Sequence, residues 1–411
     1  LMLSSVNDQA VGAVGTANTY IGIFIIMFSV ISSGMVAVMT QNIGAGRPGV
    51  AYQARQLGLA FNAVLGVIMS LFLSLGAGII LSGVGVADAL MQPAKTYLQI
   101  VGGFCILNAL IPICSSYLRA FGFSKEPLYA SIIGNVINFC LNAFFLFVLH
   151  KGVAGVATAT VISRIINLVI VVLLGAVLVK AKQHPERESN RAVMGQIIRI
   201  GLPSACETAI YNVSMTLVIR FLNQMDAQGL NVTARSYTMQ ITNFSYCVGA
   251  ALAQANAIMT GWHIGAKEYD ACDRGTKKAA VIGVIVAVIL ETVFTLCSGW
   301  IMQLFSKDPQ MVSLVGKLLA IDIVLEIGRV TNLVYGQALK TSGDAVFPVV
   351  MGACFMILCS VGGTYLFGIR LGLLAVGAYI GMTGDECVRA VGMYLRWKSG
   401  KWKEKGLVKS R

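Results

Sequence analysis

Long apolar stretches separated by short polar connections fill almost the whole chain. Each stretch reaches the roughly 20 residues that a helix needs to cross the hydrocarbon core of a bilayer. The pattern predicts eleven complete spans, with approximate bounds 13–41, 52–83, 94–120, 127–149, 153–180, 196–225, 234–262, 276–305, 310–340, 347–369 and 373–396. Several are longer than about 25 residues, which indicates tilted helices or helix ends that extend beyond the bilayer.

Composition assigns the chain to the membrane class. Of its 411 residues, 56% are hydrophobic and only 12% are charged, whereas a soluble domain carries about 25% charged residues. The net charge of +13 sits in the short connections and not on one face, so we expect no nucleic-acid partner. The ten Cys are scattered through apolar segments and the three His are far apart. This distribution predicts no cofactor, and no metal beyond a Na⁺ site.

Basic residues set the orientation. One side of the predicted membrane collects 21 Lys and Arg and the other side five, so the richer side, with the C-terminus, is cytoplasmic. We expect a multi-pass protein of the bacterial inner membrane, acting as a monomer. The basic tail RWKSGKWKEKGLVKSR either lies on anionic lipid or enforces the topology.

An internal repeat divides the chain. Ile43-Gly44-Ala45 recurs 221 residues later as Ile264-Gly265-Ala266. The same offset relates Arg119, Gly122 and Pro127 to Lys340, Gly343 and Pro348. Two six-span halves in the same orientation follow, with the substrate path between them. The predicted parts are an N-terminal lobe (1–180), a cytoplasmic linker (181–195), a C-terminal lobe (196–396) and a basic cytoplasmic tail (397–411).

The repeat also yields an expectation about the start of the chain. The first span of the second half has no full partner in the first half. The opening LMLSSVNDQAVGAVG does not read as a signal peptide. We therefore expect a twelve-helix protein whose first helix is largely missing from this sequence, leaving five full helices before residue 181.

The most distinctive stretch is Leu318–Asp344, an apolar segment that carries Asp322, Glu326 and Arg329 on one narrow stripe. Each charge inside a membrane span costs on the order of 3 kcal/mol and therefore faces a protein interior or a wet cavity. Glu326 and Arg329 at i, i+3 form either a structural pair or part of a site. Asp322 sits one turn from a second acid, which favours a site for protons or cations.

Glu207 is a second candidate. It lies eight residues past Arg199, which places it near the bilayer midplane with no basic partner within a turn. Pro203 frees the carbonyl of Arg199 for a cation or water. Tyr211 lies one turn further along and could donate to the carboxylate. The alternative is a Glu207 satisfied by hydroxyl groups such as that of Thr208, with Pro203 a plain kink.

Other polar residues of the spans carry weaker signals. Asn243 and Asn256 are candidates to support a cation site, although a helix–helix hydrogen bond suits either. Glu291 is isolated in an apolar span and is interpreted as structural or lipid-exposed, or else as lining the lobe. Asp385 and Arg389 at i, i+4 are interpreted as a structural pair.

Four motifs in order resemble the multidrug and toxic compound extrusion (MATE) family: QNIGAGRP (Gln41–Pro48), RAFGFSKEP (Arg119–Pro127), GLPSACE (Gly201–Glu207) and GQALKTSGDAVFP (Gly336–Pro348). The resemblance covers the whole chain. It implies an all-α membrane protein of two pseudo-symmetric six-helix bundles. It also implies alternating access, in which Na⁺ or H⁺ moves inward and an organic, usually cationic, compound moves out.

The resemblance also implies a cation site. The NorM-type branch of the family uses a Glu on helix 7 and an acid on helix 10, which correspond here to Glu207 and to Asp322 or Glu326. Glu207 comes earlier after its Pro than in that pattern, and Arg329 is not part of it. The family's other coupling site, an Asp on helix 1, would belong to the helix that we expect to be largely missing from this sequence.

Three classes of function can be compared with the sequence. The first is a cation-coupled antiporter that exports small organic, cationic or amphipathic compounds such as drugs. The alternative is a lipid-linked oligosaccharide flippase, which would need more spans and a more basic cavity. A membrane-bound enzyme would need a catalytic cluster that the spans do not contain. We predict that Glu326 approaches Arg329 more closely than Asp322 does, leaving Asp322 and Glu207 to exchange the coupling ion.

Overall fold

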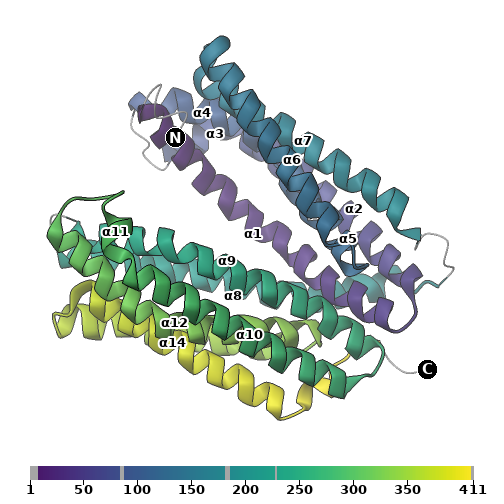
Figure 1. Ribbon diagram of the computed structural model, residues 1–411. Helices are drawn as coiled ribbons and strands as arrows, with labels where there is room; N and C mark the ends of the chain where they lie inside the picture. The colour runs from purple at the N-terminus through teal and green to yellow at the C-terminus, as the bar shows by residue number, and fades with distance from the viewer. Residues whose placement is uncertain (1–7, 84–87, 181–185, 227–228, 409–411) are drawn as a thin grey trace. The chain divides into compact units, whose positions relative to one another are not determined.

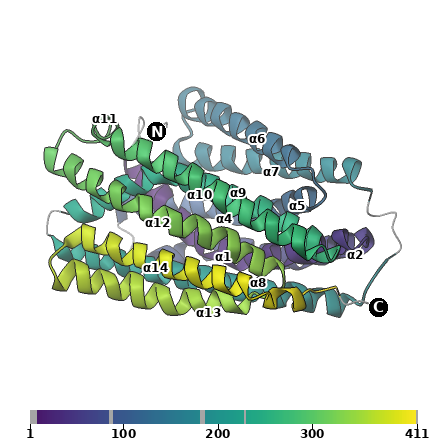
Figure 2. The same cartoon turned by 60° about the horizontal axis from the view of Figure 1, so that its bottom comes forward.

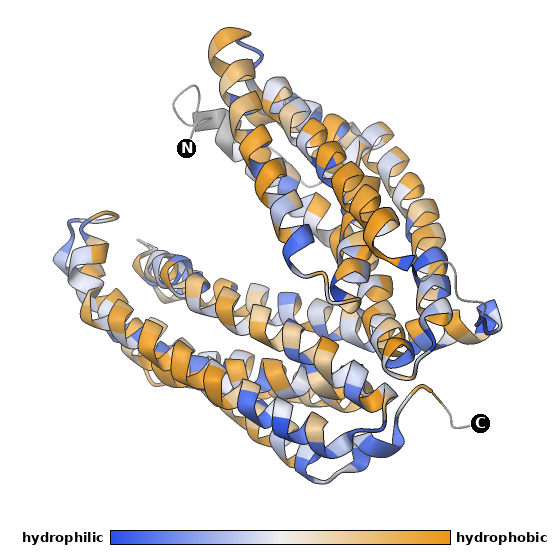
Figure 3. Cartoon of the chain, turned by 45° about the vertical axis from the view of Figure 1, so that its right-hand side comes forward, coloured by the Kyte–Doolittle hydropathy of each residue, from blue (hydrophilic) through white to orange (hydrophobic). Residues whose placement is uncertain are grey.

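The computed structural model describes residues 8–83, 88–180, 186–226 and 229–408, and nearly all of them are helical (Figure 1). No β-strand occurs in these ranges. The all-α fold predicted from the sequence is therefore confirmed. Hydrophobic residues dominate the helices, and hydrophilic residues gather toward helix ends and connections (Figure 3).

The chain divides into two compact units, one made of Leu1–Ile43 and Arg47–Leu202, the other of Gly44–Gly46 and Pro203–Arg411. The helices of the first unit are α1 (Asp8–Gly44), α2 (Pro48–Leu75), α3 (Ala77–Gly83), α4 (Asp88–Gly103), α5 (Ile106–Ala120), α6 (Lys125–Ala143) with the π-helical turn η1 (Phe144–Val148), and α7 (Gly152–Leu178).

The second unit begins inside a helix. α8 (Asn190–Met225) crosses the boundary between the units at Pro203 and starts at Asn190, so the predicted linker ends earlier than expected. Residues 181–185 of that linker lie outside the described residues. The further helices are α9 (Leu230–Gly265), α10 (Tyr269–Leu296), α11 (Ser298–Met302), α12 (Pro309–Thr341), α13 (Val346–Phe355) with the π-helical segments η3 (Met356–Val361) and η4 (Thr364–Arg370), α14 (Leu374–Lys398) and the 3₁₀ turn η5 (Lys401–Glu404).

Six helical segments of the described residues are long and apolar enough to cross a membrane, and the pair α4–α5, bent by 43°, makes a seventh. The remaining long helices α8, α9, α12 and α14 have 36, 36, 33 and 25 residues. They are long enough to cross a bilayer but carry more polar groups. Together these segments match the eleven spans predicted from the sequence.

Helix α12 is the centre of the second unit, where it packs against α9, α10 and α14 (Figure 2). Its start follows from local sequence. The Asp308 side chain accepts a hydrogen bond of 3.0 Å from the backbone N–H of Gln310, and Pro309 occupies the first turn. Val330 of α12 packs directly against Gly283 of α10. A Cβ atom added to Gly283 would lie only 2.7 Å from Val330 Cγ1. Glycine at this position therefore lets α12 approach α10.

The two sequence repeats share backbone turns. Gly122 and its counterpart Gly343 have φ angles of 90° and 97°, in the region that favours glycine. Gly46 and its counterpart Lys267 have φ angles of 70° and 62°. The constant offset found in the sequence therefore relates positions with the same local conformation.

The C-terminal tail does not present its Trp side chains to lipid, so the interpretation of a lipid-lying segment is wrong for them. Trp397 and Trp402 are both buried and stack with ring centroids 4.1 Å apart. The indole N–H of Trp397 donates to Asp273 on α10, and that of Trp402 to the carbonyl of Trp397. A Cβ on Gly343 would clash with the carbonyl of Lys405, so the tail also closes over the end of α12.

We expect Gly283→Ala to destabilise the protein by about 1–3 kcal/mol, because the new methyl group meets Val330 in a packed interior. The matched control is Gly275→Ala on the same helix, where a Cβ meets nothing within 4 Å. Thermal melting of the purified protein in detergent measures both. Adding Val330→Ala to Gly283→Ala should recover part of the loss. Equal melting temperatures for the two single variants would contradict this packing argument.

Candidate functional site

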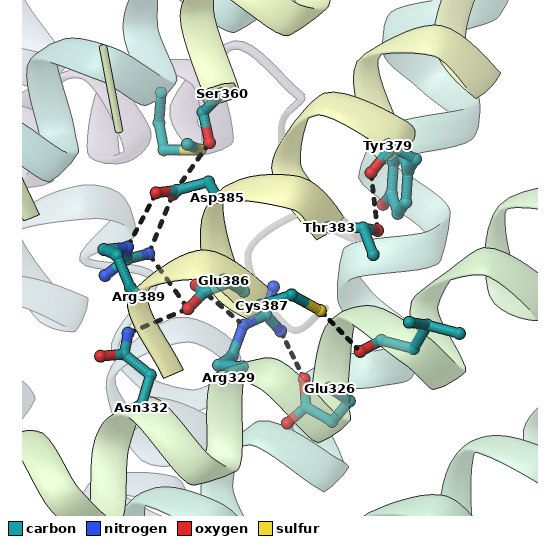
Figure 4. A network of polar contacts seen from close by, with 12 residues as sticks. Glu326, Arg329, Asn332, Ser360, Tyr379, Thr383, Asp385, Glu386, Cys387 and Arg389 are labelled. Atoms are coloured by element: carbon teal, nitrogen blue, oxygen red, sulfur yellow. Dashed lines mark hydrogen bonds and ion pairs between the residues drawn. The ribbon is translucent and has the colours of Figure 1, made fainter. Parts of the chain in front are cut away.

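A network of ion pairs joins α12 to α14 inside the second unit (Figure 4). Arg329 Nη1 lies 2.7 Å from Glu326 Oε2, and Arg329 Nε lies 3.7 Å from Glu386 Oε1. A Cβ on Gly328 would come within 2.8 Å of the α14 backbone at Cys387, so a glycine lets the two helices approach here. The predicted contact between Glu326 and Arg329 is confirmed.

A second arginine continues the network along α14. Arg389 donates two hydrogen bonds to Asp385, of 2.8 and 2.9 Å, and its Nη2 lies 3.0 Å from Glu386 Oε2. Asn332 also donates to Glu386, and Ser360 donates to Asp385. Glu386 therefore lies between two guanidinium groups (Figure 4), and the predicted pair of Asp385 with Arg389 is part of a larger cluster.

Asp322 differs from the other acids of α12 and α14. Its side chain is 2% exposed, and its Oδ2 has no hydrogen-bond partner. Within the described residues it forms no ion pair with Arg329, as the sequence analysis predicted. Glu326 keeps one oxygen, Oε1, without a partner as well. The cluster thus contains carboxylate oxygens that no protein donor satisfies, which is unusual for buried polar groups.

Asp322 lines a cavity of about 260 Å³. The cavity wall combines acids, aromatic rings and thioethers. Besides Asp322, its lining includes Asp385, Glu386, Arg235, Arg329, Tyr211, Tyr246, Tyr379, Met215, Met239 and Met382. Tyrosine faces and soft sulfur atoms suit an organic cation, and the carboxylates supply the opposite charge.

Glu207 lies on a second cavity of about 240 Å³ in the same unit. The prediction that it lacks a basic partner is wrong, because Lys340 Nζ lies 2.6 Å from Glu207 Oε2. Lys340 occupies the last turn of α12, so Glu207 sits level with that helix end and not with its middle. Lys340 lies far from Glu207 in sequence, and only the packing of α12 brings it to the carboxylate.

The supporting residues separate into two groups. Tyr211 lines both cavities but makes no hydrogen bond with Glu207 among the contacts of the described chain, and Asn243 lines the first cavity. Asn256 lies on neither wall and instead contacts Thr276 of α10 at 3.5 Å. Asn256 therefore has the helix–helix role that the sequence analysis offered as its alternative.

Sequence reasoning missed three charged residues of the cavities. Glu386 was passed over beside the more obvious pair of Asp385 and Arg389. Arg235 and Lys340 were counted only as charges that set the topology, since both lie close to helix ends. The signal that could have found Arg235 is its place one residue inside a predicted span, where an arginine is costly unless it reaches protein or water.

Long apolar helices with charged side chains on interior cavities define a class: polytopic membrane transporters and channels. The MatE family model matches the chain in two stretches, residues 1–144 and 203–366. The chain belongs to the MatE family, whose members are transporters.

Relatives extend along nearly the whole chain. The Bacillus subtilis protein named "Uncharacterized transporter YisQ" is 33% identical over 99% of this chain and 90% of its own length. A Thermotoga maritima protein named "Probable multidrug resistance protein NorM" is 21% identical over 97% of this chain and 87% of its own. A solved structure described as MATE in the straight conformation matches with a TM-score of 0.88 and 19% identity, over 98% of this chain and 91% of that one. This last match supports the fold.

We expect Arg329→Gln to destabilise the protein by about 3–5 kcal/mol, because it leaves buried acids without their counter-ion. Glu326→Gln combined with Arg329→Gln should recover part of this loss. The control is Arg274→Gln, at an exposed position of α10. Melting temperatures in detergent compare the three variants. If Arg329→Gln melted like Arg274→Gln, the ion pairs would not hold α12 against α14.

Proposed function

We propose that this chain is a cation-coupled antiporter that exports small organic cations, and that Asp322 exchanges the coupling ion. The observation that carries the proposal is the buried Asp322 carboxylate, which lines a cavity with one oxygen unpartnered. A carboxylate in that position gains by binding H⁺ or Na⁺. Glu326 serves as the counter-ion of Arg329.

Charge counting supports uptake of a cation. The cluster holds four acids (Asp322, Glu326, Asp385 and Glu386) against the two arginines Arg329 and Arg389. Arg235, on the wall of the first cavity, still leaves the acids in excess. In a low-dielectric interior an excess negative charge is unfavourable, so a proton or metal cation is attracted to the cluster.

The substrate class follows from the cavity wall and from relatives. Tyrosine rings and methionine side chains beside carboxylates suit a flat or amphipathic cation. The name "multidrug resistance protein" belongs to several relatives at 21–24% identity. A flippase for phosphate-bearing lipids would need a surplus of unpaired basic groups. The first cavity has three acids against two arginines. The second has two acids against three basic groups, but each of those basic groups is paired with an acid.

We place the protein in the bacterial inner membrane as a monomer. We place its C-terminus in the cytoplasm, because most basic connections are predicted on the same side as the C-terminus. The acidic residues are distributed unevenly along the chain. Only five of the 18 acidic residues lie before Pro203 in the sequence. The second half therefore carries the titratable chemistry that coupling needs.

Asp322→Asn tests the role of Asp322. In vesicles with an imposed Na⁺ or H⁺ gradient, tested separately, wild-type protein should move a fluorescent organic cation. Asp322→Asn should insert and melt like wild type but lose at least about tenfold in gradient-driven transport, since one neutralised acid removes the exchange step. Asp308→Asn, at an exposed helix cap, is the control. Wild-type rates in Asp322→Asn would show that the ion binds elsewhere.

Glu207 requires a paired test because Lys340 holds it. Glu207→Gln alone leaves Lys340 uncompensated and should slow transport. The double variant Glu207→Gln with Lys340→Gln removes both charges, and we expect it to restore gradient-driven transport to within about threefold of wild type. If the double variant stays as inactive as Glu207→Gln, then Glu207 itself exchanges the ion and the pair is not merely structural.

A further inference from the structure

The sequence leaves the role of Glu291 open, and the structure shows where its side chain lies. It is fully buried in the second unit, at 0% exposure, so it does not face lipid. Both of its carboxylate oxygens lack a hydrogen-bond partner. This burial leaves the other two interpretations from the sequence, a structural role and a place in the lining of the lobe.

The position of Glu291 on α10 explains its burial. The buried residues of this helix recur every three or four positions and are mostly small: Cys272, Thr276, Ala280, Gly283, Ala287 and Glu291. This stripe packs against α9 and α12. Glu291 ends the stripe, so its carboxylate points into the interior of the unit together with the small residues.

Three neighbouring helices, α12, α9 and α11, determine which polar and charged groups lie near Glu291. From α12, Asp322, Glu326 and Arg329 lie within electrostatic range. From α9, the Ser245 hydroxyl is close enough to interact with the carboxylate, although outside ordinary hydrogen-bond geometry. The short α11 contributes no titratable side chain. Arg329, the only cation among these groups, already pairs with Glu326 and Glu386.

An ionised carboxylate in this place would have no solvent and no free counter-ion, with only the Ser245 hydroxyl to support it, and would lie beside two further acids. Each of these conditions disfavours the charge. The neutral acid removes the repulsion and needs only a proton. A hard cation such as Na⁺ needs several oxygen ligands, whereas a proton needs only one carboxylate oxygen. The position therefore favours a proton over Na⁺.

We propose that Glu291 is a proton-binding site set back from the cavity wall, and that Asp322 and Glu291 exchange one proton during transport. Asp322 lines the cavity, whereas Glu291 lies on neither cavity wall. A proton entering from the cavity reaches Asp322 first, and its transfer to a Glu291 oxygen leaves Asp322 ionised and free to bind the next cation. The exchange rests on the proposed coupling role of Asp322, but the protonation of Glu291 does not.

Infrared spectroscopy of the purified wild-type protein at neutral pH tests the protonation directly. A neutral carboxylic acid has a C=O stretching band distinct from that of a carboxylate. We expect this band in wild type, its loss in Glu291→Gln, and its retention in Glu291→Asp, which keeps a carboxyl group. Glu268→Gln, at an exposed position, is the control and should leave the band unchanged. A band of unchanged position and intensity in Glu291→Gln, or no band in wild type, overturns the proposal.

Transport in vesicles tests the exchange. Glu291→Gln mimics the protonated acid permanently, so it should melt like wild type, keep binding of a fluorescent organic cation, and lose at least about tenfold in transport driven by an H⁺ gradient. Glu291→Asp should restore most of that loss. Wild-type transport by Glu291→Gln would overturn the exchange. A failure of the proposed function shows differently, as a wild-type protein that moves no cation under either gradient.

Discussion

A guanidinium group enclosed by helices must be matched by carboxylates, and this constraint organises the second unit. Arg329 and Arg389 are too costly to bury alone, so Glu386 lies between them and Glu326 and Asp385 complete their coordination. The ion pairs cross from α12 to α14 and can do so only because Gly328 allows the helices to approach. The position of α12, and with it the cavity beside Asp322, depends on these pairs.

Much of this was readable from the sequence, because it depends on local spacing. Apolar length predicted the helices, and the 221-residue offset paired Gly122 with Gly343, whose turns share left-handed backbone in the structure. The contact of Glu326 with Arg329 follows from i, i+3 spacing on one helix, and that of Asp385 with Arg389 from i, i+4 spacing. Contacts within a single helix need no knowledge of how helices pack.

The remaining contacts depend on packing between helices, which periodicity does not determine. Lys340 reaches Glu207 from another helix, so no local spacing could pair them. Glu291 was undecided because one acid in an apolar span does not show which side of the helix faces lipid. The small residues that share its stripe, Gly283 and Ala287 among them, were the available signal. The prediction for the tail was wrong because two Trp in a basic segment can either lie on lipid or stack on each other, and the sequence does not distinguish the two arrangements.

Acids that pair with a buried arginine and acids that exchange an ion need different surroundings. An acid that holds an arginine contributes to stability only while it stays ionised, so Glu326, Asp385 and Glu386 are poorly placed to release and accept protons. An acid that exchanges an ion must be free of a fixed partner, yet close enough to the cluster to feel its charge. Asp322 and Glu291 meet both conditions, since each keeps oxygens that no protein donor satisfies. Among the described residues, Asp322 and Glu291 are thus the acids beside this cluster that form no ion pair with an arginine, which is why the proposed exchange rests on them.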